Sequence, residues 1–188
     1  MKELQKNLST LLESHVQGVE PRWDRVSIGS HSAGADTIMW MVQQNSSLSQ
    51  AVVLMGPFTT NFRKPFNVSL PVLMVQNELS VQIPACIFKE FGYLHVWDLW
   101  QSKPKVRMNV KGYGHCAIGD MDLWESCKDL HFCKTNGNSS SLETYHIFSQ
   151  GITSGFLTRY LGGYGPSLAY VTNSTLMPVQ LLDFAADI

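Results

Sequence analysis

The stretch VSIGSHSAG, residues 26–34, decides the fold. It begins with β-branched residues, passes into a run of small residues, and continues into the apolar, helix-like segment 36–42. The pattern is close to G-x-S-x-G, with Ser30 in the place of the first glycine. In that pattern the chain leaves a strand, holds the central serine in a strained turn and enters a helix at once. The sequence therefore predicts a strand, a turn and a helix, with Ser32 exposed above a sheet.

The residue types in this turn also predict chemistry. Small residues at Ser30 and Gly34 suit a crowded turn, and the serine between them is predicted to be a nucleophile. The N–H of Ala33 is expected at a helix N-terminus, where it would donate to an oxyanion. An ordinary Ser/Gly turn remains the alternative, because small residues are common.

Hydrophobic periodicity predicts the remaining elements. Helices are expected over residues 2–16, 33–45 and 144–161, and strands over residues 25–29, 50–55, 70–75 and 105–110. Two of these strands are continuous apolar runs, which is typical of strands buried on both faces of a parallel sheet. The order of elements predicts a single α/β domain over residues 1–188, with a mostly parallel sheet flanked by helices.

Composition excludes several function classes. The chain has 188 residues, a formal net charge of -1 and only 15% charged residues. There is no basic patch for nucleic acid, and no apolar stretch approaches the roughly 20 residues of a membrane span. Neither a metal-ligand spacing nor a phosphate-binding glycine loop occurs, so no metal and no cofactor is predicted.

Cysteines and sequons point to a secretory route. Cys127 and Cys133 flank a short loop and could pair, although the four cysteines allow three full connectivities. N-x-[S/T] sequons are more frequent than chance predicts. They lie at Asn7, Asn45, Asn67, Asn138 and Asn173. A secreted or endomembrane-lumen protein is expected, the alternative being a soluble intracellular protein with reduced core cysteines and accidental sequons.

A base and an acid are needed to activate a serine hydroxyl. His115 follows the last clear strand in a glycine-rich turn and is the predicted base, the alternative being a surface or capping histidine. Glu78 is the single carboxylate in the loop after strand 70–75, so it is the candidate acid, or else an exposed loop charge. His31 lies inside the turn around Ser32, which we call the elbow. Its side chain is expected to point to the wrong side of this turn for catalysis.

Several stretches together resemble the chlorophyllases and chlorophyllase-like α/β hydrolases over roughly residues 22–165. They are the elbow, VKGYGH at 110–115, CKTNG at 133–137 and GFLTRYL at 155–161. The resemblance implies hydrolysis of a lipophilic carboxylic ester, such as chlorophyll to chlorophyllide and phytol, by a Ser–acid–His triad. Carried over to this chain, it makes Ser32 the nucleophile and His115 the base, with no cofactor.

The chain departs from plant chlorophyllases at three places. Those proteins have Gly at the position of Ser30, Arg at that of Ala33, and an Asp where this chain has Gly56-Pro57. A generic esterase or lipase of the same family is therefore an alternative. The aromatic segments 58–66 and 88–100 are expected to wall a lipophilic pocket or, alternatively, to form plain core.

The region before the elbow is short. Only about 25 residues precede strand 25–29, whereas the α/β-hydrolase fold places several strands there, one loop of which supplies a second oxyanion donor. The chain is therefore expected to be the C-terminal part of such a fold, with the N-terminal strands missing, an uncovered sheet edge and low stability or activity. A non-catalytic relative that binds a lipophilic ligand or a protein partner is the competing hypothesis.

Overall fold

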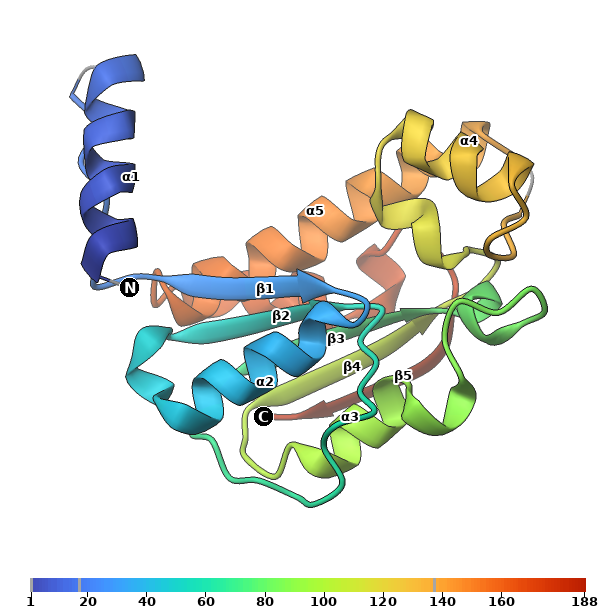
Figure 1. The fold of residues 1–188 in the computed structure, drawn as a ribbon, viewed down its shortest axis with the longest axis horizontal. Coiled ribbons are helices and arrows are strands. Elements are labelled where there is room, and N and C mark those ends of the chain that lie inside the picture. Colours follow the sequence, from blue (N-terminus) through green and yellow to red (C-terminus); the bar gives the residue numbers. More distant parts are fainter. Residues whose placement is uncertain (1, 17, 137) are drawn as a thin grey trace.

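A five-stranded sheet forms the centre of the molecule in the computed structural model, which describes residues 2–16, 18–136 and 138–188 (Figure 1). The strand order is β1-β2-β3-β4-β5; β1 to β4 are parallel, and β5 is antiparallel to β4. The strands are β1 Ser27–His31, β2 Ala51–Met55, β3 Val72–Asn77, β4 Lys105–Val110 and β5 Leu181–Asp187. The predicted mixed α/β class with a mostly parallel sheet is confirmed.

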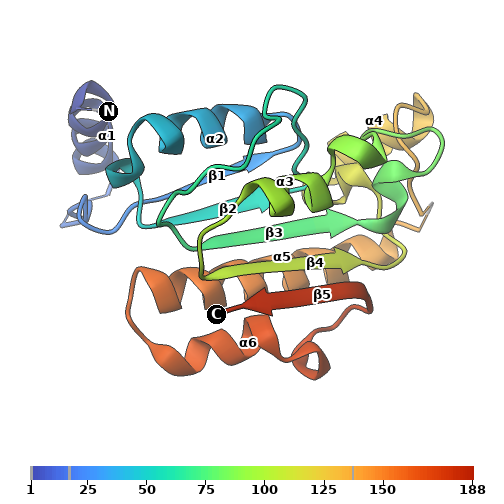
Figure 2. The same ribbon diagram turned by 90° about the horizontal axis from the view of Figure 1, so that it is seen from below.

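Helices cover both faces of the sheet (Figure 2). The face with α2 and α3 lies opposite the face with α5 and α6. The α-helices are α1 Lys2–His15, α2 Gly34–Gln44, α3 Tyr93–Leu99, α4 Met121–Asp129, α5 Ser140–Tyr160 and α6 Ala169–Thr172. Short 3-10 helices span Ser46–Leu48, Glu78–Val81, Lys89–Phe91, His115–Ile118, Gly165–Leu168 and Ser174–Leu176. Among the described residues, none of the helices combines the length and apolar content needed to cross a membrane.

The central strands are buried on both faces. Every residue of β2 and β3 is buried, as their continuous apolar sequence predicts. Alternate residues of β2 serve two cores: Val53 and Met55 face α5, whereas Val52 and Leu54 pack with α2 and α3. The buried strands therefore hold the loops at their carboxyl ends in fixed positions.

Three elements differ from the sequence-based prediction. No strand was predicted for the C-terminal tail, which ends in β5, and no helix was predicted for residues 93–99 or 121–129, which form α3 and α4. β5 carries Asp183, whose charge interrupts the apolar pattern of a strand. That carboxylate accepts hydrogen bonds from Arg107 Nη1 (2.6 Å) and Tyr93 Oη (2.8 Å), so its charge is paired within the fold.

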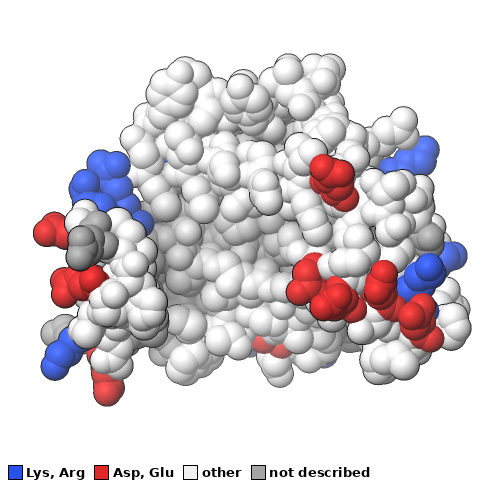
Figure 3. Space-filling model, turned by 90° about the horizontal axis from the view of Figure 1, so that it is seen from above, with Lys and Arg blue, Asp and Glu red and all other residues white. Residues whose placement is uncertain are grey.

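β1 lies at an edge of the sheet, and within the described part of the chain it pairs with β2 alone. Its residues are only partly buried, in contrast to those of β2. The predicted uncovered sheet edge is thus present. Figure 3, which looks down on this side of the molecule, shows a broad hollowed surface without charged side chains between α1 and α4.

Candidate functional site

The turn between β1 and α2 has the strained geometry that its sequence predicts. Ser32 has φ +59°, in the left-handed region that non-glycine residues rarely occupy. A Cβ added at Gly34 would lie 3.0 Å from the Cβ of Ser30, so a larger residue at position 34 would crowd the turn. The backbone N–H of Ser32 donates to the carbonyl oxygen of Met55 (3.0 Å), which ties the turn to the end of β2.

Ala33 is the N-cap residue of α2. Its backbone N–H therefore lies at the positive end of the dipole of an 11-residue helix. This placement matches the expected position of an oxyanion donor. Its use as one remains a prediction.

His115 lies against the end of the neighbouring strand. Its side chain is buried, and a Cβ added at Gly56 would lie 2.7 Å from its Cε1 and 2.8 Å from its Nδ1. Gly56 directly follows Met55, whose carbonyl oxygen binds the N–H of Ser32. Ser32 and His115 therefore approach the same peptide unit at the carboxyl end of β2.

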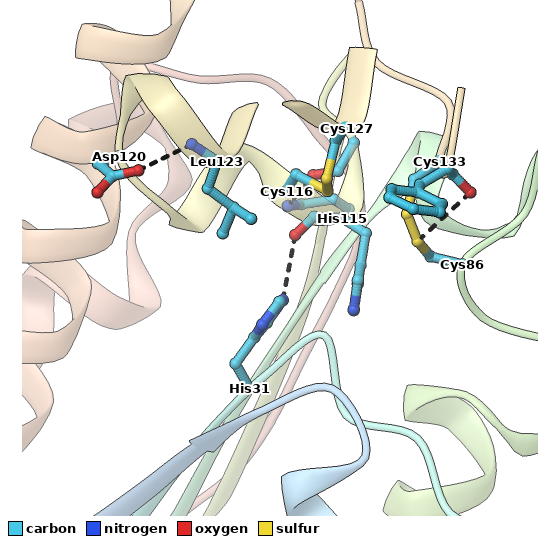
Figure 4. The surroundings of a disulfide bond; sticks show 11 residues. His31, Cys86, His115, Cys116, Asp120, Leu123, Cys127 and Cys133 are labelled. Carbon is cyan, nitrogen blue, oxygen red and sulfur yellow. Dashed lines mark hydrogen bonds between the residues drawn. A yellow bond between two sulfur atoms is a disulfide. The ribbon is translucent and has the colours of Figure 1, made fainter. Parts of the chain in front are cut away.

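His31 stacks on His115, so the expectation that it points to the wrong side is wrong (Figure 4). The ring centroids are 4.3 Å apart, and the ring planes meet at 28°. His31 Nε2 donates to the carbonyl oxygen of His115 (3.1 Å), which fixes the tautomer of His31. The reason is that His31 is still the last residue of β1 and projects from the sheet, whereas the chain turns only at Ser32.

Burial favours the neutral form of both rings. Burial, together with the neighbouring His31, lowers the pKa of His115 to about 3. Burial also lowers the pKa of His31, against the opposing effect of its bond to the His115 carbonyl. Neither ring nitrogen of His115 has a hydrogen-bond partner among the described residues. A ring nitrogen of His115 is therefore unoccupied, but none of the described carboxylates is hydrogen-bonded to the ring to stabilise an imidazolium.

Glu78 holds the turn before His115 and not its ring. Its Oε2 accepts a hydrogen bond from the backbone N–H of Gly112 (2.8 Å). Asn77 Nδ2 donates to the carbonyl oxygen of Gly114 (2.8 Å). The backbone N–H of Leu79 donates to the carbonyl oxygen of Tyr113 (2.9 Å). Three consecutive residues at the end of β3 therefore hold the three residues that precede His115.

The residues after His115 are also fixed. His146 Nε2, on α5, lies 3.1 Å from the carbonyl oxygen of Ala117 and 2.9 Å from that of Gly119, and it donates to them. Cys116 is joined to Cys127 of α4 by a disulfide. Asn77 and His146 were missed at the sequence level, because hydrogen bonds to backbone carbonyls of distant residues leave no pattern.

The disulfides are Cys86–Cys133 and Cys116–Cys127, so the suggested pairing of Cys127 with Cys133 is wrong. The Cα atoms of the two pairs are 5.2 Å and 6.5 Å apart. The pairing of Cys127 with Cys133 was suggested by their closeness in sequence. In the structure Cys127, on α4, instead lies against the 3-10 helix that contains Cys116, 11 positions earlier. The Sγ atoms of Cys116, Cys127 and Cys133 all lie within 4.8 Å of one another. Disulfide sulfurs lack the thiolate charge that binds metals, so this cluster is not a preformed metal site.

A groove of about 400 Å³ runs beside β1 and reaches His31. Its walls are mostly apolar, and none of its lining residues is Asp, Glu, Lys or Arg. The lining residues are Ser27, Ile28, Gly29, Ser30, His31, Val53, Met55, Ile118, Thr153 and Leu157. The groove therefore offers apolar contact next to the stacked histidines.

Fold and site geometry together define a mixed α/β protein with a serine elbow and a buried histidine at the carboxyl edge of the sheet. Comparisons of the chain with protein-family models and with curated protein sequences find no match.

Proposed function

We propose that the protein is a serine carboxylic-ester hydrolase. The observation that carries the proposal is the position of Ser32, at positive φ and hydrogen-bonded to the carbonyl of Met55, while the His115 ring lies beside the adjoining Gly56. In the proposed reaction Ser32 Oγ attacks the ester carbonyl while His115 takes its proton, and the Ala33 N–H binds the oxyanion. His115 then protonates the leaving alcohol. Water, deprotonated by His115, releases the acid from the acyl-enzyme and restores Ser32.

A lipophilic ester is the proposed substrate class. The apolar groove beside β1 supports it, because the lining of the groove includes His31, which is stacked on the proposed base. The resemblance of the sequence to chlorophyllases makes a chlorophyll-like phytyl ester the first candidate. Of the aromatic segments expected to wall a lipophilic pocket or to form core, Phe66 and Trp100 form core, packing edge to face with centroids 5.3 Å apart, whereas Phe62 lines a separate cavity next to Trp40.

A positioning role for Glu78 is proposed in place of the expected role as triad acid, and it gives a sharp test. Glu78→Gln keeps an oxygen that can accept from Gly112, so we expect kcat on p-nitrophenyl butyrate to fall less than about threefold. Loss of a true triad carboxylate costs about 10⁴-fold. Glu78→Ala removes the acceptor and is expected to lower kcat about tenfold or more, because the turn of His115 loosens.

The two variants distinguish the roles without ambiguity. A collapse of activity in Glu78→Gln as large as that in Glu78→Ala would restore Glu78 as the triad acid. Circular dichroism and the melting temperature of both variants control for unfolding.

A non-catalytic relative that binds a lipophilic ligand is the second candidate. The unpartnered ring of His115 and its low pKa favour it, because a base with these properties takes a proton from serine reluctantly. A fluorophosphonate probe separates the two. Labelling at Ser32 that His115→Ala abolishes supports the hydrolase, and an unlabelled folded protein supports the binding protein.

We further propose that the protein matures in an oxidising secretory compartment, where its two disulfides would persist. Asn45, Asn67, Asn138 and Asn173 are all exposed. Asn45, Asn138 and Asn173 each accept, through Oδ1, from the hydroxyl and the backbone N–H of the residue two positions on. These sequons are therefore accessible for glycan transfer.

Expression through a secretory pathway is expected to give a protein whose mass falls in steps on treatment with an N-glycosidase. Each Asn→Gln change at one of these four positions is expected to remove one step. Asn136→Gln is the matched control, since Asn136 is not in a sequon. A secreted protein without any glycan would contradict the assignment of these positions.

A further inference from the structure

The two disulfides lie next to each other. They use all four cysteines of the chain, and the Sγ atoms of Cys116, Cys127 and Cys133 all lie within 4.8 Å of one another. Figure 4 shows both bonds beside the stacked histidines. Disulfides exchange partners when a thiolate attacks a sulfur of an existing bond. A thiolate released from one of these bonds would therefore have the sulfurs of the other bond close at hand.

The four sulfurs differ in their exposure to solvent. Cys116, Cys127 and Cys133 are buried, whereas Cys86 is partly exposed and follows the exposed residue Ala85. A thiol reagent in solution needs access to the sulfur that it attacks. Such a reagent would therefore react at Cys86. The sulfur that leaves is then Cys133, which is buried among the sulfurs of the second disulfide.

The end of α4 directs Cys133 toward Cys127. The backbone N–H of Phe132 donates to the carbonyl oxygen of Cys127 (3.2 Å), and that of His131, at φ +51°, donates to the carbonyl oxygen of Lys128 (3.3 Å). These two bonds form a Schellman motif, which ends the helix and turns the chain back. Cys127 lies in the last turn of α4, where the negative end of the helix dipole disfavours a thiolate.

This geometry favours one direction of exchange. Cys133 attacks Cys127, whose sulfur remains bonded, and Cys116 leaves as the thiolate because it lies away from the end of α4. The product is a disulfide between Cys127 and Cys133, which are six positions apart in the sequence.

We propose that Cys86 is a redox modification site, at which an external dithiol starts a thiol–disulfide relay that ends at Cys116. In the first step a thiolate of the dithiol bonds to Cys86 Sγ, the bond from Cys86 to Cys133 breaks, and Cys133 becomes a thiolate. The second sulfur of the dithiol then displaces Cys86, which takes up a proton, and the dithiol leaves as its own disulfide.

The second step takes place within the protein. Cys133 bonds to Cys127, the bond from Cys116 to Cys127 breaks, and Cys116 takes up a proton. In total the dithiol loses two electrons and two protons, and the protein gains them. One disulfide remains, and the two new thiols are Cys86 and Cys116.

The relay would change what holds His115. Cys116 follows His115 in the chain, and its disulfide ties this segment to α4. After the relay the segment keeps the hydrogen bonds from His146 but has lost that covalent tie. We expect kcat to fall about tenfold as a result. This consequence rests on the proposed hydrolase function, whereas the relay itself needs no catalysis.

A matched pair of single variants tests the internal step without any reductant. Cys86→Ser leaves a thiol at Cys133, within the sulfur cluster, whereas Cys133→Ser leaves one at Cys86, outside it. Each protein is blocked with N-ethylmaleimide under mildly acidic denaturing conditions, which stop exchange, and its peptides are mapped by mass spectrometry. In Cys86→Ser at least about a tenth of the label is expected on Cys116, because the thiol exchanges with the neighbouring bond.

In Cys133→Ser the label is expected on Cys86 alone. Label confined to Cys133 in the Cys86→Ser variant would overturn the relay. Label on Cys127 in that variant would show that the exchange runs in the other direction, and it would overturn the assignment of Cys116 as the end of the relay.

The unmodified chain provides a test that does not depend on the folding of a variant. After treatment with one equivalent of dithiothreitol, label is expected on Cys86 and Cys116. Label on Cys86 and Cys133 would mean that reduction stops at the first bond, and absence of label from Cys86 would mean that the reagent enters elsewhere. Either result contradicts the proposal.

Hydrolysis of p-nitrophenyl butyrate is measured on the same samples before and after the treatment. A chain that shows the expected labelling but hydrolyses nothing in either state contradicts the proposed function and leaves the relay standing. A chain that hydrolyses the ester but lacks label on Cys116 contradicts the relay and leaves the proposed function standing.

Discussion

Replacement of Ser32 by alanine is expected to lower hydrolysis of p-nitrophenyl butyrate by at least about 10³-fold, to the background of the buffer. The Ser32 hydroxyl is the protein group that bonds to the acyl carbon in the proposed reaction, and alanine offers no nucleophile in its place. His115→Ala is expected to have an effect of similar size, because serine and base act as one unit. The rate of p-nitrophenolate release measures both.

Ser174→Ala is the matched control, since Ser174 is exposed in a 3-10 helix outside the site. Full activity of Ser32→Ala would show that any hydrolysis arises elsewhere on the chain. The rates of hydrolysis of chlorophyll a and of p-nitrophenyl butyrate are then compared to identify the preferred substrate. Preference for chlorophyll supports the chlorophyllase resemblance, and preference for the small ester supports a generic esterase.

Local patterns were enough to predict the sheet up to β4. Strands β2 and β3 are apolar throughout, so their sequences carry the signal of burial on both faces. β5 gave no such signal, because it is an edge strand whose Asp183 is compensated by Arg107 on the neighbouring strand. Such compensation is visible only when the strands are paired.

In the candidate site too, local features could be predicted from the sequence, whereas contacts between distant residues could not. Ser32 could be predicted because its strain arises within one turn, between residues that are adjacent in sequence. The stacking of His31 on His115 joins residues 84 positions apart, and the bond from Gly112 to Glu78 spans 34. Residue types alone give no geometry across such separations. For this reason the local prediction placed Glu78 beside the wrong group.

The two disulfides are expected to differ in their effects: loss of one lowers stability more, and loss of the other lowers activity more. Cys86–Cys133 spans 47 positions and Cys116–Cys127 spans 11, so loop closure predicts losses of about 4 and about 3 kcal/mol of unfolding free energy. Thermal denaturation of Cys86→Ser/Cys133→Ser should therefore show the larger fall in Tm, about 10 °C.

Activity is expected to follow the second disulfide. Cys116 is the neighbour of His115, so Cys116→Ser/Cys127→Ser frees one end of the segment that carries the proposed base. We expect its kcat at 25 °C to fall about tenfold, while Cys86→Ser/Cys133→Ser changes kcat less than about threefold provided that both variants are folded. If kcat instead follows Tm across the two variants, the disulfides act on overall stability alone, and Cys116–Cys127 does not position His115.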